Sequence, residues 1–210
     1  MNNSNIYDTQ YRFIHVNKCG GKSLNHSLNE MLTKKRKEYH EVHGLVGTPV
    51  TKNAKGKLIL FVRDPIERAI SSYHYDRVKK RQYDLDFNDY IRNIQKDSNK
   101  MNTHLRFSLS WYIDPEQMKD MNFFFVGTLE NISDDYKKLI EKLEIPKNDI
   151  VELPHFNMTI RLGHKVDPKN LDFLREYYKK DYECLDILEK KGYITKKYLD
   201  NILEKKEYTY

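Results

Sequence analysis

Hydrophobic and polar positions along this chain alternate between strand-like and helix-like patterns. Segments with the length and composition of strands lie at 12–17, 37–42, 58–63 and 123–127. Apolar residues with helical spacing occur at 22–35, 65–81, 86–97, 131–144, 168–191 and 195–206. Because strands and helices alternate in the first third of the chain, the pattern predicts a parallel sheet with right-handed crossover connections.

The segment 168–191 is the longest predicted helix. Asp167 and Pro168 are a capping residue and a first-turn proline, which is the usual start of a helix. Its apolar positions are expected to pack on the sheet, and they are Leu171, Leu174, Tyr178, Leu185 and Leu188.

The segment from Phe13 to Leu24, FIHVNKCGGKSL, joins a predicted strand to a predicted helix through a glycine-containing turn. Glycines let the backbone approach an anion closely, and the N–H groups and dipole of a helix N-terminus favour negative charge. Lys18 and Lys22 add positive charge on either side of Gly20 and Gly21. The sequence therefore predicts a phosphate-binding loop here.

A second anion-binding element follows the apolar run 58–62. Arg63 stands at the carboxyl end of this predicted strand, where ligands bind in open α/β sheets. Its guanidinium matches a phosphate group by bidentate hydrogen bonding. Pro65 suits the first turn of the next helix, and Ser71 lies two turns further on.

These two segments together resemble the sulfotransferases that use 3′-phosphoadenosine-5′-phosphosulfate (PAPS), in particular the carbohydrate (heparan/chondroitin-type) branch. The 5′-phosphosulfate loop of that branch typically reads F-I-H-[IV]-P-K-T-G-G-T-S-L, and residues 13–24 match it apart from Asn17, Cys19 and Lys22. Its 3′-phosphate element typically reads [FV]-V-R-D-P-x-x-R-x-x-S-x-Y, and residues 61–73 match every defined position.

The resemblance covers roughly residues 11–190 and extends to two weaker motifs. Residues 125–130, FVGTLE, resemble the family's V-G-x-x-E strand, and residues 153–157, LPHFN, resemble its L-P-x-x-N segment. The resemblance implies an α/β, P-loop-like three-layer fold, with a central parallel sheet flanked by helices. We expect one sulfotransferase domain over residues 1–210, since no linker, repeat or low-complexity stretch divides the chain.

For the donor site, the resemblance implies that Lys18 stabilises the leaving 5′-phosphate and that Arg63 and Ser71 bind the 3′-phosphate. The residues expected to form the 5′-phosphosulfate loop are Lys18, Cys19, Gly20, Gly21, Lys22, Ser23 and Leu24. In-line sulfuryl transfer needs such groups in any protein, because negative charge grows on the oxygen between phosphorus and sulfur. Arg161 and Lys165 belong to a late basic loop that is expected to close over the nucleotide, as in related sulfotransferases.

The acceptor hydroxyl needs a proton acceptor, and histidine suits that role near neutral pH. His43 is the first candidate, since a histidine followed by glycine in this region is the usual base candidate of the carbohydrate branch. His40 and Glu41 remain alternatives.

Five residues are expected to contact the acceptor. They are His40 and Glu41 of the second predicted strand, and His104, Arg106 and Trp111 between the third and fourth predicted strands. Trp111 either stacks on a sugar face or belongs to the core.

Charge and composition agree with anionic ligands. The chain has 37 Lys and Arg against 31 Asp and Glu, which gives a formal net charge of +6. We expect PAPS and a hydroxyl acceptor, most simply a glycan, as partners, without a metal, nucleic acid or a membrane segment. The two cysteines, Cys19 and Cys184, do not indicate a disulfide framework. A cytoplasmic location is expected, because no signal peptide or anchor pattern is visible.

Two other functions remain open on the sequence alone. An ATP-dependent kinase of small molecules would use Lys22 on phosphate and Asp64 near Mg²⁺, since Gly21-Lys22-Ser23 resembles the end of a P-loop. However, Val16 occupies the position of the first P-loop glycine. A non-catalytic module that binds an anionic polysaccharide would keep only the fold.

Overall fold

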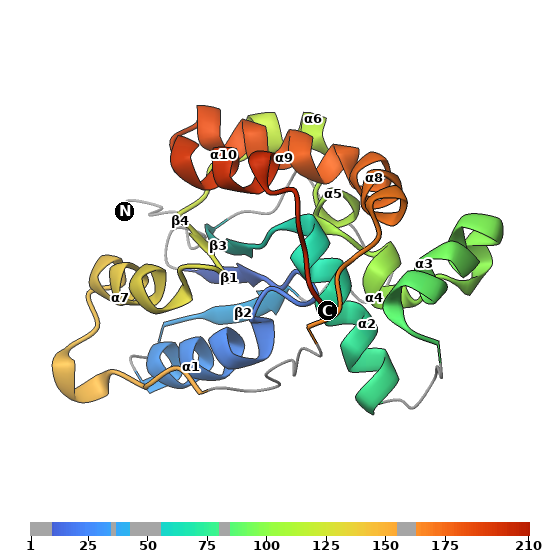
Figure 1. Cartoon of the computed structure of the whole chain (residues 1–210). Coiled ribbons are helices and arrows are strands. Elements are labelled where there is room, and N and C mark those ends of the chain that lie inside the picture. Colours follow the sequence, from blue (N-terminus) through green and yellow to red (C-terminus); the bar gives the residue numbers. More distant parts are fainter. Residues whose placement is uncertain (1–9, 35–36, 43–55, 80–84, 155–162) are drawn as a thin grey trace.

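A four-stranded parallel sheet forms the centre of the molecule (Figure 1). The computed structural model describes residues 10–34, 37–42, 56–79, 85–154 and 163–210. The strands are β1 (Tyr11–Ile14), β2 (Tyr39–Val42), β3 (Lys57–Val62) and β4 (Phe125–Thr128), in the order β2-β1-β3-β4. Because all neighbouring pairs are parallel, their carboxyl ends lie at one edge of the sheet.

Helices cover both faces of this sheet, so the predicted three-layer α/β fold is confirmed. Figure 1 shows α9 and α10 on one side of the sheet and α1 and α7 on the other. The α-helices are α1 (Gly21–Lys34), α2 (Pro65–Lys79), α3 (Phe87–Lys96), α4 (Thr103–Arg106), α5 (Leu109–Tyr112), α6 (Pro115–Asp120), α7 (Ile132–Lys142), α8 (Pro168–Tyr177), α9 (Lys179–Lys190) and α10 (Lys196–Glu204). Short 3₁₀ helices occupy Ser98–Lys100 and Lys147–Asp149. None of these helices is long and apolar enough to cross a membrane.

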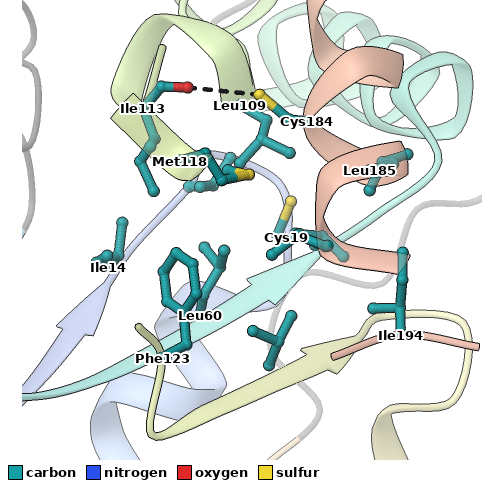
Figure 2. Packing of buried hydrophobic residues seen from close by; sticks show 14 of the residues in the cluster. Ile14, Cys19, Leu60, Leu109, Ile113, Met118, Phe123, Cys184, Leu185 and Ile194 are labelled. Carbon is teal, nitrogen blue, oxygen red and sulfur yellow. Dashed lines mark hydrogen bonds between the residues drawn. The ribbon is translucent and has the colours of Figure 1, made fainter. Parts of the chain in front are cut away.

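Strand β3 is buried on both faces, as its continuous apolar sequence predicts. Leu60 packs in one core cluster with Leu185 of α9, whereas its neighbour Phe61 packs in a second cluster with Leu28 of α1. Successive side chains of a strand point to opposite faces, so a strand that lies between two helical layers needs apolar residues at every position. Figure 2 shows Leu60 and Leu185 in the first cluster, together with Cys19.

The segment predicted as one helix at 168–191 is two helices, α8 and α9, which meet at Tyr178. Leu185 of α9 packs against the sheet as expected. Leu174 of α8 instead packs with residues of α2 and α3 in a third cluster, and Tyr178 belongs to that cluster too. The break at Tyr178 lets the two halves bury their apolar faces in two different cores.

The short helices α4 to α6 were not expected from the pattern of apolar residues. Asp181 of α9 is fully buried and accepts hydrogen bonds from the Ser108 hydroxyl at 2.6 Å and from the backbone N–H groups of Leu109 (3.1 Å) and Ser110 (2.9 Å). These are N–H groups of the first turn of α5, which have no partner within the helix itself. A residue more than 70 positions away therefore caps this helix, and local sequence carries no signal of it.

Candidate active site

The loop between β1 and α1 lies at the carboxyl edge of the sheet. Lys18 and Gly20 both have positive φ, 67° and 77°, so the chain passes twice through the left-handed region. The turn is closed by a hydrogen bond from Cys19 N–H to the Val16 oxygen at 3.3 Å. Because a lysine seldom adopts this backbone conformation, the surroundings must hold it there.

Gly21 begins α1 in close contact with the imidazole of His15. A Cβ added at Gly21 would lie 1.8 Å from ring atoms of His15, so no other residue fits without moving the ring. His15 is buried, and its Nδ1 shares a hydrogen bond with Glu41 of β2. The second oxygen of Glu41 accepts a hydrogen bond from the Asn25 amide of α1 at 2.6 Å. Glu41, an alternative base, therefore connects β1, β2 and α1.

Lys18 extends over an aromatic side chain of α2. Its Nζ lies 4.1 Å from the centroid of the Tyr75 ring, and the Nζ of the exposed Lys22 lies 5.8 Å from it. Burial, and to a smaller extent the positive charge of Arg63, lower the pKa of Lys18 to about 8. The Lys18 ammonium thus lies in a partly desolvated region of positive charge, and such a region favours the binding of an anion.

The ring of Tyr75 contacts His104 as well as Lys18. The two rings meet edge to face with 5.1 Å between centroids. The Nδ1 of His104 is 3.3 Å from an oxygen of Asp76, whose side chain is buried on α2. One tyrosine therefore joins the predicted catalytic lysine to a histidine that was predicted to bind the acceptor.

Arg63 connects the two predicted donor motifs. Its Nη1 donates a hydrogen bond to the main-chain oxygen of Lys18 at 3.3 Å, and its Nη2 lies 3.6 Å from a carboxylate oxygen of Glu67. Ser71 is buried two turns into α2, and Ser23 is buried in the first turn of α1. The structure thus brings the β1 and β3 motifs to one edge of the sheet.

Cys19 faces away from solvent into the core above the sheet (Figure 2). Only 2 % of it is exposed, and burial raises the pKa of its thiol to about 12. Cys19 therefore does not act in the loop as a thiolate. Leu24 is likewise fully buried, in the cluster between β1, β3 and α1.

Asp64 caps α2 and anchors the C-terminal segment. One of its oxygens accepts from the Ile66 N–H at 2.8 Å, and the other accepts from the Tyr208 hydroxyl at 2.8 Å. Burial raises the pKa of this carboxyl to about 6. The main-chain N–H of Asp64 donates to Glu130, which follows β4. Asp64 is thus occupied by structural contacts, and the contact with Tyr208 was not foreseen from sequence.

Arg68 has a structural role that sequence reasoning missed. Its guanidinium is fully buried and donates to the main-chain oxygens of His104 (2.6 Å) and Leu105 (3.2 Å). It also lies 5.0 Å from the Tyr178 ring centroid. Arg68 therefore fixes the backbone beside His104.

Two further acceptor candidates lie near His104 in sequence. Arg106 is exposed and donates to the Ser98 main-chain oxygen at 3.3 Å. Trp111 is half-buried and packs on the Phe107 ring, with 4.3 Å between centroids, at the border of the core. Trp111 thus packs partly against the core and is partly exposed, so stacking on a sugar and a core role both remain open.

The remaining candidates are more dispersed. His40 is exposed on β2, two residues before the end of that strand. Lys165 is exposed and forms an ion pair with Glu207 at 3.0 Å. His43 and Arg161 lie outside the described residues.

Comparison with known proteins by sequence and by structure finds sulfotransferases in both cases. Residues 5–186 match the family model described as the sulfotransferase family. The chain belongs to the sulfotransferase family. The enzyme thus transfers sulfuryl groups and uses PAPS as co-substrate.

A solved structure supports the fold of this sulfotransferase. The structure of a sulfotransferase from Alicyclobacillus acidocaldarius is similar to it with a TM-score of 0.51 and 14% sequence identity. The similarity covers 85% of this chain and 94% of that one. No curated protein matches the chain.

Proposed function

We propose that this sulfotransferase transfers the sulfuryl group of PAPS to a hydroxyl group of a carbohydrate, with Lys18, Arg63 and Ser71 as its donor-site side chains. The observation that carries the donor site is the hydrogen bond from Arg63 to the Lys18 main chain. It joins the two motifs that resemble the 5′-phosphosulfate and 3′-phosphate elements. The carbohydrate acceptor rests on the resemblance of both motifs to the carbohydrate branch.

The acceptor oxygen attacks sulfur in line while the bond from sulfur to the bridging phosphate oxygen breaks. Negative charge therefore grows on that oxygen, which leaves as part of the 5′-phosphate. The Lys18 ammonium and the backbone N–H groups of Gly20 and Gly21 stabilise this charge. With a pKa of about 8, Lys18 is mostly protonated at neutral pH, which is the form that this role requires.

The acceptor's proton passes to His43, with His40 and Glu41 as alternatives. Glu41 is the weaker alternative, because its two oxygens already bond to His15 and Asn25. His104 is proposed as an acceptor contact, since it reaches the Lys18 region through the Tyr75 ring.

The donor site is tested by binding of adenosine 3′,5′-bisphosphate, the product of the donor, measured by calorimetry and by the thermal midpoint. We expect wild type to bind it more tightly than ATP with Mg²⁺, and Arg63→Ala to lose most of this affinity. The control is Arg92→Ala, since Arg92 is an exposed arginine of α3 paired with Asp89 and Asp167. Unchanged binding in Arg63→Ala would overturn the proposed donor site.

The acceptor is tested by transfer of ³⁵S from labelled PAPS to two panels. One panel contains desulfated heparan and chondroitin chains, and the other contains phenols and simple alcohols. We expect label in the glycans, and its loss in Lys18→Met. Label in the phenols alone would refute the carbohydrate acceptor while the sulfotransferase activity stands.

A further inference from the structure

Glu67 lies between two cations that come from distant parts of the chain. Its Oε1 accepts a hydrogen bond from the Lys205 ammonium at 2.7 Å, and its Oε2 is 3.6 Å from Nη2 of Arg63. The Glu67 and Arg63 side chains are 7 % and 14 % exposed, whereas that of Lys205 is 38 % exposed. Water therefore has little access to Arg63 and Glu67 and more access to Lys205.

Lys205 is held in position by contacts of both its main chain and its side chain. Its main-chain oxygen accepts a hydrogen bond from Arg175 of α8 at 2.6 Å. Its ammonium lies 4.2 Å from the Tyr208 ring centroid, and the Tyr208 hydroxyl bonds to Asp64 at the start of α2. The contact between Lys205 and Glu67 is thus part of the docking of the C-terminal segment on α2.

All three side chains line one cavity of about 540 Å³ beside the carboxyl ends of β3 and β4. Its other walls are formed by residues of β3–α2, of the segment after β4 and of α10: Asp64, Leu129, Glu130, Asn131, Thr195, Lys197, Tyr198, Asn201 and Ile202. The guanidinium of Arg63, which is proposed to bind the 3′-phosphate, is therefore part of the wall of this cavity.

A carboxylate close to a phosphate-binding arginine competes with the phosphate for its positive charge. Arg63 and Glu67 alone sum to zero charge, and Lys205 brings the group to +1. We propose that Lys205 is a positioning residue of the donor site, which neutralises Glu67 and thereby keeps Arg63 available to the 3′-phosphate. This inference rests on the proposed role of Arg63.

The inference is tested with two nucleotides that differ only in the 3′-phosphate, adenosine 3′,5′-bisphosphate and adenosine 5′-monophosphate. Calorimetry on the full chain gives both affinities for wild type, Arg63→Ala, Lys205→Met, Lys205→Arg, Glu67→Gln and the double variant Lys205→Met/Glu67→Gln. We expect Lys205→Met to weaken the bisphosphate about tenfold or more, and the monophosphate much less. Lys205→Arg keeps the charge and is expected to retain the wild-type affinity.

The double variant separates positioning from a merely structural role. It lacks both Lys205 and the charge of Glu67, so the summed charge of positions 63, 67 and 205 returns to +1 and bisphosphate affinity is expected to recover. Lys196→Met is the matched control, because Lys196 is an exposed lysine at the start of α10 that is outside the lining of the cavity. We expect it to bind the bisphosphate nearly as wild type does. Thermal midpoints without nucleotide show whether each variant is folded.

The two proposals fail in different ways in this experiment. If wild type does not prefer the bisphosphate to the monophosphate, or if Arg63→Ala keeps that preference, the donor site itself is refuted. If Arg63→Ala loses the preference while folded Lys205→Met retains it, only the role of Lys205 is overturned. An equal loss for both nucleotides, or a double variant as weak as Lys205→Met, also overturns it.

Discussion

The guanidinium of Arg63 donates a hydrogen bond to the main-chain oxygen of Lys18, over 3.3 Å and 45 positions of sequence. Arg63 follows β3 and Lys18 follows β1, and these strands are direct neighbours in the sheet. The contact therefore joins the two predicted anion-binding motifs directly. Such preorganisation reduces the cost of arranging the charged groups when the nucleotide binds.

Replacement of Lys18 by methionine should reduce turnover far more than nucleotide binding. Loss of one donor to the developing charge costs about 10²–10³ in kcat in comparable sites. Steady-state kinetics with PAPS, together with calorimetry of the bisphosphate, measure the two effects separately. Lys22→Met removes an exposed lysine near the same Tyr75 ring and should lose less. Equal losses in the two variants would contradict the assignment of Lys18.

The pH dependence of the reaction should follow the protonation of Lys18. Its pKa is lowered to about 8, so the free enzyme loses the required proton as pH rises through that value. We expect kcat/KM for PAPS to fall above pH 8 and kcat to fall only at higher pH, because the bound phosphates favour the charged lysine. In Lys18→Arg the fall should disappear, since arginine stays protonated. A fall at the same pH in this variant would assign it to another group.

A side chain at Gly21 should destabilise the protein through His15. The added Cβ of Gly21→Ala would lie 1.8 Å from the imidazole, and overpacking of a buried site typically costs about 1–3 kcal/mol. Urea unfolding measures this cost. Since His15→Ala removes the ring, the double variant should be more stable than the sum of the single changes predicts. Strict additivity would mean that the backbone moves and that the ring does not decide the effect.

Loss of the Asp181 carboxylate should unfold the region that carries α5. Asp181→Ala leaves the Ser108 hydroxyl and the N–H groups of Leu109 and Ser110 without their acceptor. Because each buried unsatisfied group costs about 1–3 kcal/mol, a loss of several kcal/mol in the free energy of unfolding is expected. Asp186→Ala is the control on the same helix, since its ion pair with Lys190 is exposed and should change stability by about 0.5 kcal/mol or less.

The acceptor contact proposed for His104 should show itself in kinetics with the glycan. His104→Ala is expected to raise KM for the acceptor and leave KM for PAPS nearly unchanged, because the ring reaches the Lys18 region only through Tyr75. Arg92→Ala is the comparison, since Arg92 is an exposed arginine of α3 paired with Asp89 and Asp167, and it should leave both KM values nearly unchanged. A rise in KM for PAPS alone would move His104 to the donor side.

The strands and the longer helices could be predicted closely from the sequence, because their patterns are local. The apolar run of β3 and the helix after Pro65 lie within a few residues of their predicted bounds. The first strand is shorter than expected and ends at Ile14, since the chain must leave the sheet before the turn at Lys18. The break at Tyr178 was missed, because a continuous apolar pattern does not reveal that its two halves face different cores.

By itself, the sequence was enough to predict the parallel sheet and to propose the two anion-binding motifs, because a glycine turn, a strand end and a helix start are formed by residues adjacent in the chain. Only the tertiary structure decided which side chains act between motifs. The contact of Lys205 with Glu67 spans 138 positions, and the caps supplied by Asp181 span more than 70. Such pairs follow from how the helices pack on the sheet, and the spacing of residues along the chain does not encode that packing in readable form.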